Sequence, residues 1–367
     1  MSSFSVCFRC AGLGFKFEKD ITCNPCNGTG KITRKSGKAK KKFHVSYPSF
    51  VASGPSTFRN EYEISLGGNE ELSYLTGKWR IFQKLKTHRY STDDIMTSYL
   101  ACRELKALHL ENPKILDIGC GLGSVLMMNA WQIPDATCVG IEAQHDRYLL
   151  AIRSVEYNLG TFGINQNRVS VVYGDIRDFS IPELGRSSCY DLITGTPPYF
   201  DKTLLGQPGC IETASCLFEH RGGVEDYCQT ASHCLGTNND KPGLFVICNT
   251  ALSSGRLYKA CSTFSLIVLR RVDIIGKQGH DPLFCVFVAT HKKWRGYYEE
   301  KLNLRLSELD TTGLPDGRIQ GNVCGEDNET IIIRASNLEH SAEYADILAL
   351  LSKPSSRNKE IHGSHEE

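Results

Sequence analysis

The sequence predicts an α/β protein with a doubly wound, mostly parallel sheet and a small cysteine-rich module ahead of it. Three observations support this prediction. Short apolar strands alternate with helical segments, a glycine-rich turn follows one of these strands, and a cysteine pattern is repeated near the N-terminus. The expected boundaries are a cysteine-rich module over 1–32, a basic flexible linker over 33–60, the α/β domain over 61–352 and a disordered tail over 353–367.

The composition indicates a globular protein. Hydrophobic residues make up 41% and charged residues 23% of the 367 residues, and the formal net charge is +1. No apolar run reaches the roughly eighteen residues that span a bilayer, so we expect no membrane association. Sixteen cysteines without an N-terminal signal segment predict a reducing compartment, by default the cytoplasm.

The cysteine pattern CxxCxGxG occurs twice, as CFRCAGLG over 7–14 and CNPCNGTG over 23–30. Two close thiolates from each copy can complete a tetrahedral zinc shell, while the glycines let the backbone turn toward the sulfurs. The pattern resembles the cysteine-rich repeats of J-domain chaperones, which carry more copies. We therefore predict one structural Zn²⁺; the alternative is four free thiols in a disordered leader. The predicted ligands are Cys7, Cys10, Cys23 and Cys26.

A basic segment follows the cysteines. Residues 1–43 hold ten Lys or Arg and two Asp or Glu. The whole chain has 42 Lys or Arg and 41 Asp or Glu, so the remaining residues hold 32 basic and 39 acidic side chains. Residues 33–42 show no apolar periodicity and cannot bury a core face. The segment favours a polyanionic partner or nuclear import, and a solvated tether between two modules explains it equally well.

A glycine-rich turn opens the α/β domain. The segment KILDIGCGLG over 114–123 indicates a buried strand that runs into the turn, and Ser124 to Trp131 is helical in character. A nicotinamide fingerprint needs Gly or Ala where Ser124 stands. The pattern therefore fits S-adenosylmethionine better, because this cofactor has no pyrophosphate and its amino-acid tail needs room at Gly119 and Gly121. Asp117 is the candidate acid for the tail.

Two further acids end predicted strands. Glu142 follows the strand over 136–141, and its carboxylate can accept both ribose hydroxyls. The segment over 169–175 is a third predicted strand, and Asp175 at its end is the candidate partner of the adenine amino group. Each acid taken singly is also compatible with a helix cap. Further apolar strands are expected over 190–194, 266–269 and 282–289, which makes the predicted fold Rossmann-like.

The segment GTPPYF over 195–200 closely resembles the NPPY motif of methyltransferases that act on planar nitrogens. Their acceptors are adenine N6, cytosine N4 and the glutamine amide of release factors. Thr196 stands where the motif has asparagine. The resemblance implies that Thr196 and Pro197 accept the hydrogens of the target amino group, that Pro198 completes the motif and that Tyr199 stacks on the acceptor.

A second resemblance lies upstream and at the C-terminus. Gln83 and HRYSTDD over 88–94 resemble a segment of the bacterial valine-tRNA adenine-N6 methyltransferase family, and SAEYADIL over 341–348 resembles its C-terminus. The resemblance implies a class I methyltransferase that uses S-adenosyl-L-methionine to modify an adenine N6 of tRNA or another RNA. A basic arm that holds RNA would suit this activity, and a protein partner remains open.

Two other functions are compatible with the same residues. A protein glutamine N5-methyltransferase would share the proline motif, although the basic arm argues modestly against it. A catalytically silent adaptor would keep the fold and the zinc module, and the departure at Thr196 favours it. Transfer of labelled methyl groups to total tRNA would separate the three hypotheses.

Overall fold

The computed structural model describes residues 66–67, 69–85, 87–185, 190–201, 214, 216–235, 242–301 and 329–354. Of residues 1–65 it describes only the backbone of four short strands, which pair antiparallel as β1 with β4 and β2 with β3. Their bounds are β1 Phe4–Val6, β2 Phe15–Lys16, β3 Ile21–Thr22 and β4 Lys31–Thr33.

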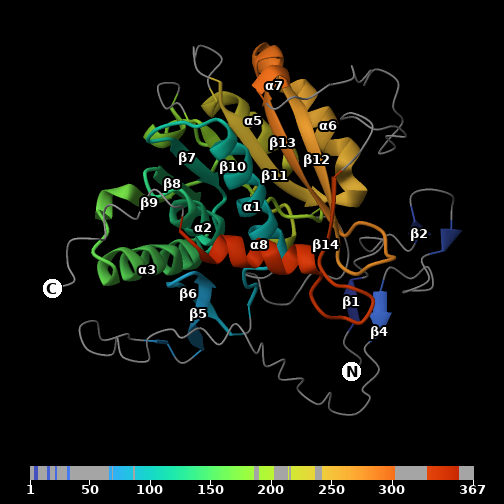
Figure 1. Cartoon of the computed structure of the whole chain (residues 1–367), viewed down its shortest axis with the longest axis horizontal. Coiled ribbons are helices and arrows are strands. Elements are labelled where there is room, and N and C mark those ends of the chain that lie inside the picture. The colour runs from blue at the N-terminus through green and yellow to red at the C-terminus, as the bar shows by residue number, and fades with distance from the viewer. Residues whose placement is uncertain are drawn as a thin grey trace.

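An eight-stranded sheet forms the centre of the protein (Figure 1), in the order β14-β12-β13-β11-β10-β7-β8-β9. Every neighbouring pair is parallel except the two that involve β13, which runs antiparallel to both β11 and β12. The strands are β7 Lys114–Ile118, β8 Thr137–Glu142, β9 Val169–Tyr173, β10 Leu192–Gly195, β11 Leu244–Thr250, β12 Leu266–Ile275, β13 Phe284–His291 and β14 Glu329–Ile332. This order confirms the predicted Rossmann-like α/β sheet.

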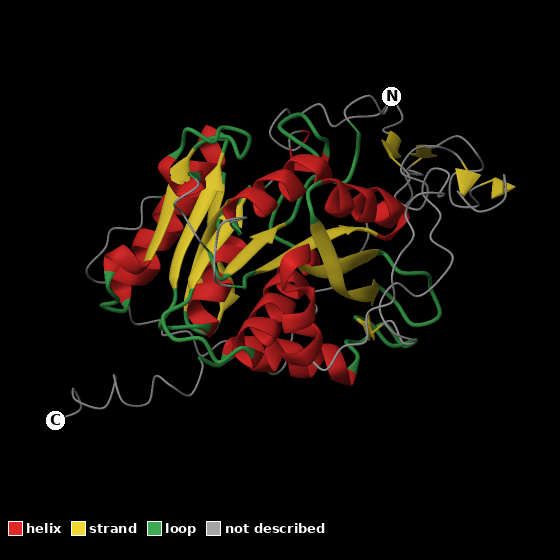
Figure 2. Cartoon of the chain, turned by 90° about the horizontal axis from the view of Figure 1, so that it is seen from above, coloured by secondary structure: helices red, strands yellow, loops and turns green. Residues whose placement is uncertain are grey.

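Helices cover both faces of the sheet (Figure 2). Consecutive side chains of a strand point to opposite faces, so Ile115 joins the core beneath α1, α2, α3 and α8, while Leu116 joins the core beneath α5 and α6. Burial on both faces explains why these strands are continuous apolar runs. The described helices are α1 Thr92–Ala107, α2 Ser124–Gln132, α3 His145–Thr161, α5 Val224–Cys234, α6 Ser254–Thr263, α7 Arg295–Lys301 and α8 Ala342–Ser352.

A β-hairpin precedes the sheet and packs on α3. It consists of β5 (Glu70–Thr76) and β6 (Trp79–Lys84). Side chains of α3 bind the backbone amides on the unpaired side of β6. Arg80 N donates to Asn158 Oδ1 at 2.8 Å, and Phe82 N donates to Ser154 Oγ at 3.0 Å. These bonds remove the exposed strand edge that an isolated hairpin would present.

The C-terminal helix α8 returns to the hairpin and to α2. Gln132, at the end of α2, donates from Nε2 to the backbone carbonyls of Leu351 and Lys353, at 2.7 and 2.8 Å. Thr76 of β5 donates to the same Leu351 carbonyl at 2.7 Å. Hydrogen bonds to the end of α8 therefore join it to the hairpin and to α2.

Candidate active site

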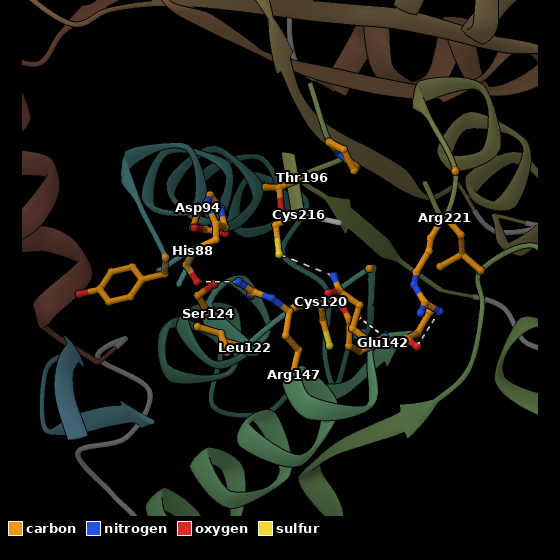
Figure 3. Close-up of a pocket in the computed structure, with 18 of the residues that line it drawn as sticks. His88, Asp94, Cys120, Leu122, Ser124, Glu142, Arg147, Thr196, Cys216 and Arg221 are labelled. Atoms are coloured by element: carbon orange, nitrogen blue, oxygen red, sulfur yellow. Dashed lines mark hydrogen bonds between the residues drawn. The ribbon is translucent and has the colours of Figure 1, made fainter. Parts of the chain in front are cut away.

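A cavity opens at the edge of the sheet where the parallel strands end, which is where open α/β sheets bind their ligands. It encloses about 770 Å³ including space open to solvent, and we call it the glycine-turn cavity. Six segments line it: 88–94, the turn over 119–124, 142–147, Ile176, the proline segment at Thr196 and Pro198, and residues 216–227. Figure 3 shows Asp94, His88 and Thr196 at one end, Glu142 and Arg221 at the other, and the Arg147 guanidinium between them.

The glycine turn requires its glycines. Gly119 and Gly121 have φ angles of +67° and +59°, in the left-handed region that side chains disfavour. A Cβ at Gly119 would also lie 2.0 Å from the Tyr227 hydroxyl. The structure therefore places both predicted glycines in the cavity wall, where the bare backbone leaves room for a ligand.

Glu142 lines the cavity at the end of β8. Its carboxylate accepts hydrogen bonds from Gly121 N at 2.8 Å and from Gln144 N at 2.6 Å. Burial raises the pKa of Glu142, while these bonds and the nearby Arg147 oppose the rise. Each oxygen keeps acceptor capacity beyond its one backbone bond, so the carboxylate can still accept from ligand hydroxyls.

Asp117 is close to the turn but does not line the cavity. It is 2% exposed, accepting from Leu126 N at 3.1 Å and from Thr194 Oγ1 at 2.7 Å. Burial raises its pKa to about 7. These contacts join β7, the start of α2 and β10, so Asp117 holds the backbone on which the turn is built.

Asp175 also lies outside the cavity lining. It forms a two-bond ion pair with Arg177, from Nε at 2.8 Å and from a terminal nitrogen at 2.6 Å, and this pair lowers its pKa. The next residue, Ile176, does line the cavity. The segment after β9 thus reaches the site, with an apolar side chain facing the space.

Some residues of the proline segment (195–200) line the cavity, and others lie outside its lining. Thr196 and Pro198 line the cavity, whereas Pro197 is buried outside its lining. Tyr199 packs against the hydrophobic core, and its hydroxyl donates to Asp93 Oδ2 at 2.7 Å and lies 3.0 Å from Cys248 Sγ. The predicted stacking ring therefore lies outside the cavity lining.

The lining also contains titratable residues that were not predicted as site residues, among them Asp94 and His88. Asp94 caps α1 by accepting from Ser91 N at 2.8 Å, and burial together with Asp93 raises its pKa. His88 has a pKa lowered by burial and by Arg147. Both lie in the segment over 88–94 that resembles the tRNA methyltransferases, so this resemblance could have indicated them as site residues. The sequence did not indicate that they lie beside the glycine turn.

Arg147 carried no signal in the sequence. It is 4% exposed, lines the cavity from α3 and donates to the His88 carbonyl at 2.6 Å. Its Nε atom is buried and has no hydrogen-bond partner within the described residues. A buried guanidinium with spare donor capacity suits an anionic ligand group such as a carboxylate.

The predicted zinc ligands Cys7, Cys10, Cys23 and Cys26 lie outside the described residues. Within the described ranges, no group of three or more His, Cys, Asp or Glu residues is arranged to hold a metal ion. The helices of the same ranges include none that is long and apolar enough to cross a membrane.

Comparisons with known proteins give distant relatives of one kind. No protein-family model matches the chain. A tRNA1(Val) (adenine(37)-N6)-methyltransferase from Photorhabdus laumondii is 35% identical over 88 residues, which are 24% of this chain and 33% of that protein. A protein of the same name from Pedobacter heparinus is 30% identical over 136 residues, which are 37% and 47% of the two chains. The matches thus span between a third and about half of these relatives.

Solved structures show more distant similarity. A predicted O-methyltransferase from Agrobacterium tumefaciens aligns over 69% of this chain and 97% of its own, at 15% identity and a TM-score of 0.42. A ribosomal protein L11 methylase from Lactobacillus delbrueckii aligns over 54% and 79%, at 12% identity and a TM-score of 0.35. Similarity at this level identifies no shared function.

Proposed function

We propose that the protein is an S-adenosylmethionine-dependent methyltransferase whose acceptor is N6 of an adenine in tRNA or another RNA. One observation carries the proposal: the glycine turn, Glu142, Thr196 and the segment 88–94 meet in the glycine-turn cavity, although they are far apart in the sequence. The curated relatives support the choice of acceptor, since both are named as tRNA adenine-N6 methyltransferases.

The glycine-turn cavity fits the cofactor in charge and shape. Gly119 and Gly121 leave the wall free of side chains, and Glu142 presents a carboxylate for the ribose hydroxyls. Asp94 at the opposite end suits the ammonium group of the methionine part, and Arg147, between the two ends, suits its carboxylate. When bound, S-adenosylmethionine supplies an electrophilic methyl group on a positively charged sulfur.

Asp117 would affect cofactor binding indirectly, by holding the glycine turn in place. Because both of its oxygens are engaged by Leu126 and Thr194, we assign it the role of a positioning residue that fixes the glycine turn. Asp175 is occupied by Arg177, which makes Ile176 the candidate contact for the adenine ring. These assignments refine the roles expected from the sequence.

The acceptor amino group is proposed to lie against Thr196. Its hydroxyl and the Pro197 carbonyl would accept the two amino hydrogens, which directs the nitrogen lone pair away from the ring and toward the methyl group. A base in a duplex would have to be extruded to reach this position. After transfer the nitrogen must lose a proton, and the lowered pKa of His88 leaves a neutral imidazole in the cavity to receive it.

Methyl transfer tests the proposal directly. Purified protein, labelled S-adenosylmethionine and total tRNA should yield labelled RNA that digests to N6-methyladenosine. A matched reaction with a release factor tests the glutamine alternative, in which the label would appear on the protein. Absence of transfer to either acceptor, with cofactor binding intact, would instead support a silent adaptor.

One structural observation favours the silent adaptor, in addition to the departure at Thr196. Tyr199 is tied to Asp93 and lies outside the cavity lining, so the ring expected to stack on the acceptor is not presented to it. A Tyr199→Phe variant removes the bond to Asp93. In an active enzyme it should alter the rate of methyl transfer, whereas in an adaptor neither protein transfers a methyl group.

The N-terminal region is proposed to hold zinc and RNA. Metal analysis should find one Zn²⁺ per chain, which a Cys7→Ser/Cys26→Ser double variant should lose. Removal of residues 1–43 should weaken RNA binding and flatten its salt dependence, by about 0.7 in the slope of log affinity against log salt for each phosphate that the region neutralises. Unchanged zinc content or an unchanged slope would contradict the respective assignment.

A further inference from the structure

A second cavity lies at the same edge of the sheet, beside the ends of β12 and β14 and the start of β13. It encloses about 1470 Å³ including space open to solvent. Its walls come from β5 (Tyr74–Thr76), Tyr90, the start of α1, residues 283–284, residues 333–334 and α8. We call it the β5–α8 cavity; Figure 1 shows α8 running from β14 toward the β5–β6 hairpin.

Tyr90 separates the two cavities and lines both. Its hydroxyl donates to the Tyr74 carbonyl at 2.6 Å, which fixes the ring against β5. Burial raises the pKa of Tyr90 to about 12, so the hydroxyl keeps its proton and this bond at physiological pH. A ligand in the β5–α8 cavity would therefore lie next to whatever occupies the glycine-turn cavity.

The lining of the β5–α8 cavity contains no Asp or Glu. It presents the aromatic rings of Tyr74, Tyr90, Phe284 and Tyr344 among aliphatic side chains, and it carries the cationic Arg334. His340 is kept neutral at pH 7, because burial and Arg334 lower its pKa. The surface therefore suits a planar, uncharged ring system with an anionic group that can pair with Arg334.

A nucleotide has this chemistry. Every base presents a π-face that stacks on aromatic side chains, and its phosphate can pair with an arginine. Arg334 is half-buried and donates from one terminal nitrogen to the Leu338 carbonyl at 2.8 Å, which leaves its other donors for a phosphate.

We infer that the β5–α8 cavity binds a second base of the substrate RNA, a neighbour of the adenine that enters the glycine-turn cavity. The inference rests on the proposed function. Tyr90 would lie between the two bases, and Arg334 would contact the backbone phosphate of the second. Selection of the RNA would thus depend on the nucleotide beside the target as well as on the basic arm.

Gly276 offers a way to fill this cavity. It lines the β5–α8 cavity, and a Cβ added there would meet only Leu283 Cδ2, at an ordinary 3.7 Å. Gly276→Leu should therefore place a side chain in part of the cavity without disturbing the fold. Gly296→Leu is the matched control, because Gly296 lies in α7, outside the cavity, with open space around its Cβ position.

The test measures RNA binding separately from methyl transfer. The probe is a short single-stranded RNA that carries 2-aminopurine, whose fluorescence falls on stacking. Gly276→Leu should weaken its binding about tenfold, the typical effect of losing one stacked base, while Gly296→Leu binds as the wild type does. Arg334→Gln should lower the salt slope by about 0.7, and Arg334→Lys should restore it. Unchanged cofactor affinity confirms that each variant is folded.

The outcomes separate this inference from the proposed function. If Gly276→Leu weakens probe binding but the wild type transfers no methyl group to tRNA, the second base site is supported and the proposed methyltransferase activity is rejected. Methyl transfer to tRNA by the wild type, with the same KM for tRNA in Gly276→Leu and the same probe binding, keeps the activity and overturns the second site.

Discussion

The glycine-turn cavity and the β5–α8 cavity lie on either side of Tyr90, yet they differ in charge and in origin. The first is lined by acids and bases, among them Asp94, Glu142 and Arg147, and much of its wall is formed by short sequence motifs. The second lacks carboxylates and collects aromatic and aliphatic side chains from segments as distant as β5 and α8. Charged groups suit a cofactor that carries charges of both signs, whereas a stacking surface suits a base.

The difference shows how a reaction site and a recognition site can be built at one sheet edge. Groups that must bond charged atoms need fixed positions, and strand ends and tight turns provide these positions. A stacking surface tolerates more variation in its residues, because any flat or apolar side chain can contribute. Substitutions in the glycine turn should therefore have the strongest effects, and those at more distant groups weaker ones.

Gly119→Ala should abolish detectable cofactor binding and leave the β5–α8 cavity unaffected. The new Cβ would lie 2.0 Å from the Tyr227 hydroxyl, in a residue with a φ of +67°. Backbone strain alone costs about 1–3 kcal/mol in the free energy of unfolding. Calorimetry with S-adenosylmethionine and denaturant titration measure the two effects.

The matched control for this change is Gly163→Ala. Gly163 also has a positive φ, +62°, but its Cβ position has no neighbour within 4 Å. It should show the cost of strain without losing cofactor binding. If Gly119→Ala binds the cofactor as Gly163→Ala does, the close approach of Tyr227 does not shape the cavity.

Glu142→Ala should weaken cofactor binding by about ten- to a hundredfold, because a hydrogen bond to a charged group contributes about 1.5–3 kcal/mol. Asp175→Ala should have a smaller effect, since Asp175 is paired with Arg177 outside the cavity lining. Isothermal titration of both variants measures the difference. Equal losses would return Asp175 to the adenine-binding role expected from the sequence.

Thr196→Ala should slow methyl transfer by roughly ten- to a hundredfold at saturating cofactor, through loss of one acceptor of the target amino group. Thr196→Asn should keep or raise the rate, because it restores the side chain found in the NPPY motif. Single-turnover transfer to tRNA is the measurement. Equal rates in wild type and Thr196→Ala would remove the hydroxyl from the mechanism.

The stability of the protein should fall as pH rises through the range in which Asp117 ionises in the folded state. Its pKa is raised to about 7 by burial, above about 3.9 in an unfolded chain, so between these values the folded state binds more protons than the unfolded state. The free energy of unfolding therefore decreases with pH from about 4 to 7, and the Asp117 contribution levels off above 7.

Asp117→Asn tests this linkage. The amide does not ionise, so the difference in stability between wild type and variant should shift by about 1–3 kcal/mol in favour of the variant between pH 5 and 8. Denaturant titrations at the two pH values measure the shift, and Asp178→Asn on the surface serves as the control. A constant difference would show that the pKa of Asp117 is not raised.

Local sequence patterns predicted most of the central sheet and part of the site. The strands expected within 114–123 and over 136–141, 169–175, 190–194, 266–269 and 282–289 all appear, with bounds that differ by up to six residues. The positive φ angles of Gly119 and Gly121, and the placement of Glu142 in the cavity, follow from the strand–turn–helix pattern. Such features depend on residues adjacent in sequence.

Other roles could not be predicted because they depend on partners far away in sequence. Asp117 accepts a hydrogen bond from Thr194, 77 residues later, and Tyr199 donates one to Asp93, 106 residues earlier. An acid at a strand end looks the same in the sequence whether it faces a ligand or a buried hydroxyl. Asp94 was noted only as part of the segment over 88–94, and the structure shows that it both caps α1 and lines the cavity.

Apolar alternation and the steric freedom of glycine act over a few residues, so the chain's own order of residues was enough to specify the doubly wound α/β body, the glycine turn and the acids at the strand ends. Three-dimensional packing was needed to establish which of those residues face the glycine-turn cavity, that Arg147 is buried there, and that β5 meets α8 across a second cavity. These outcomes depend on side chains from distant segments, where burial and charge are set jointly by all the neighbours.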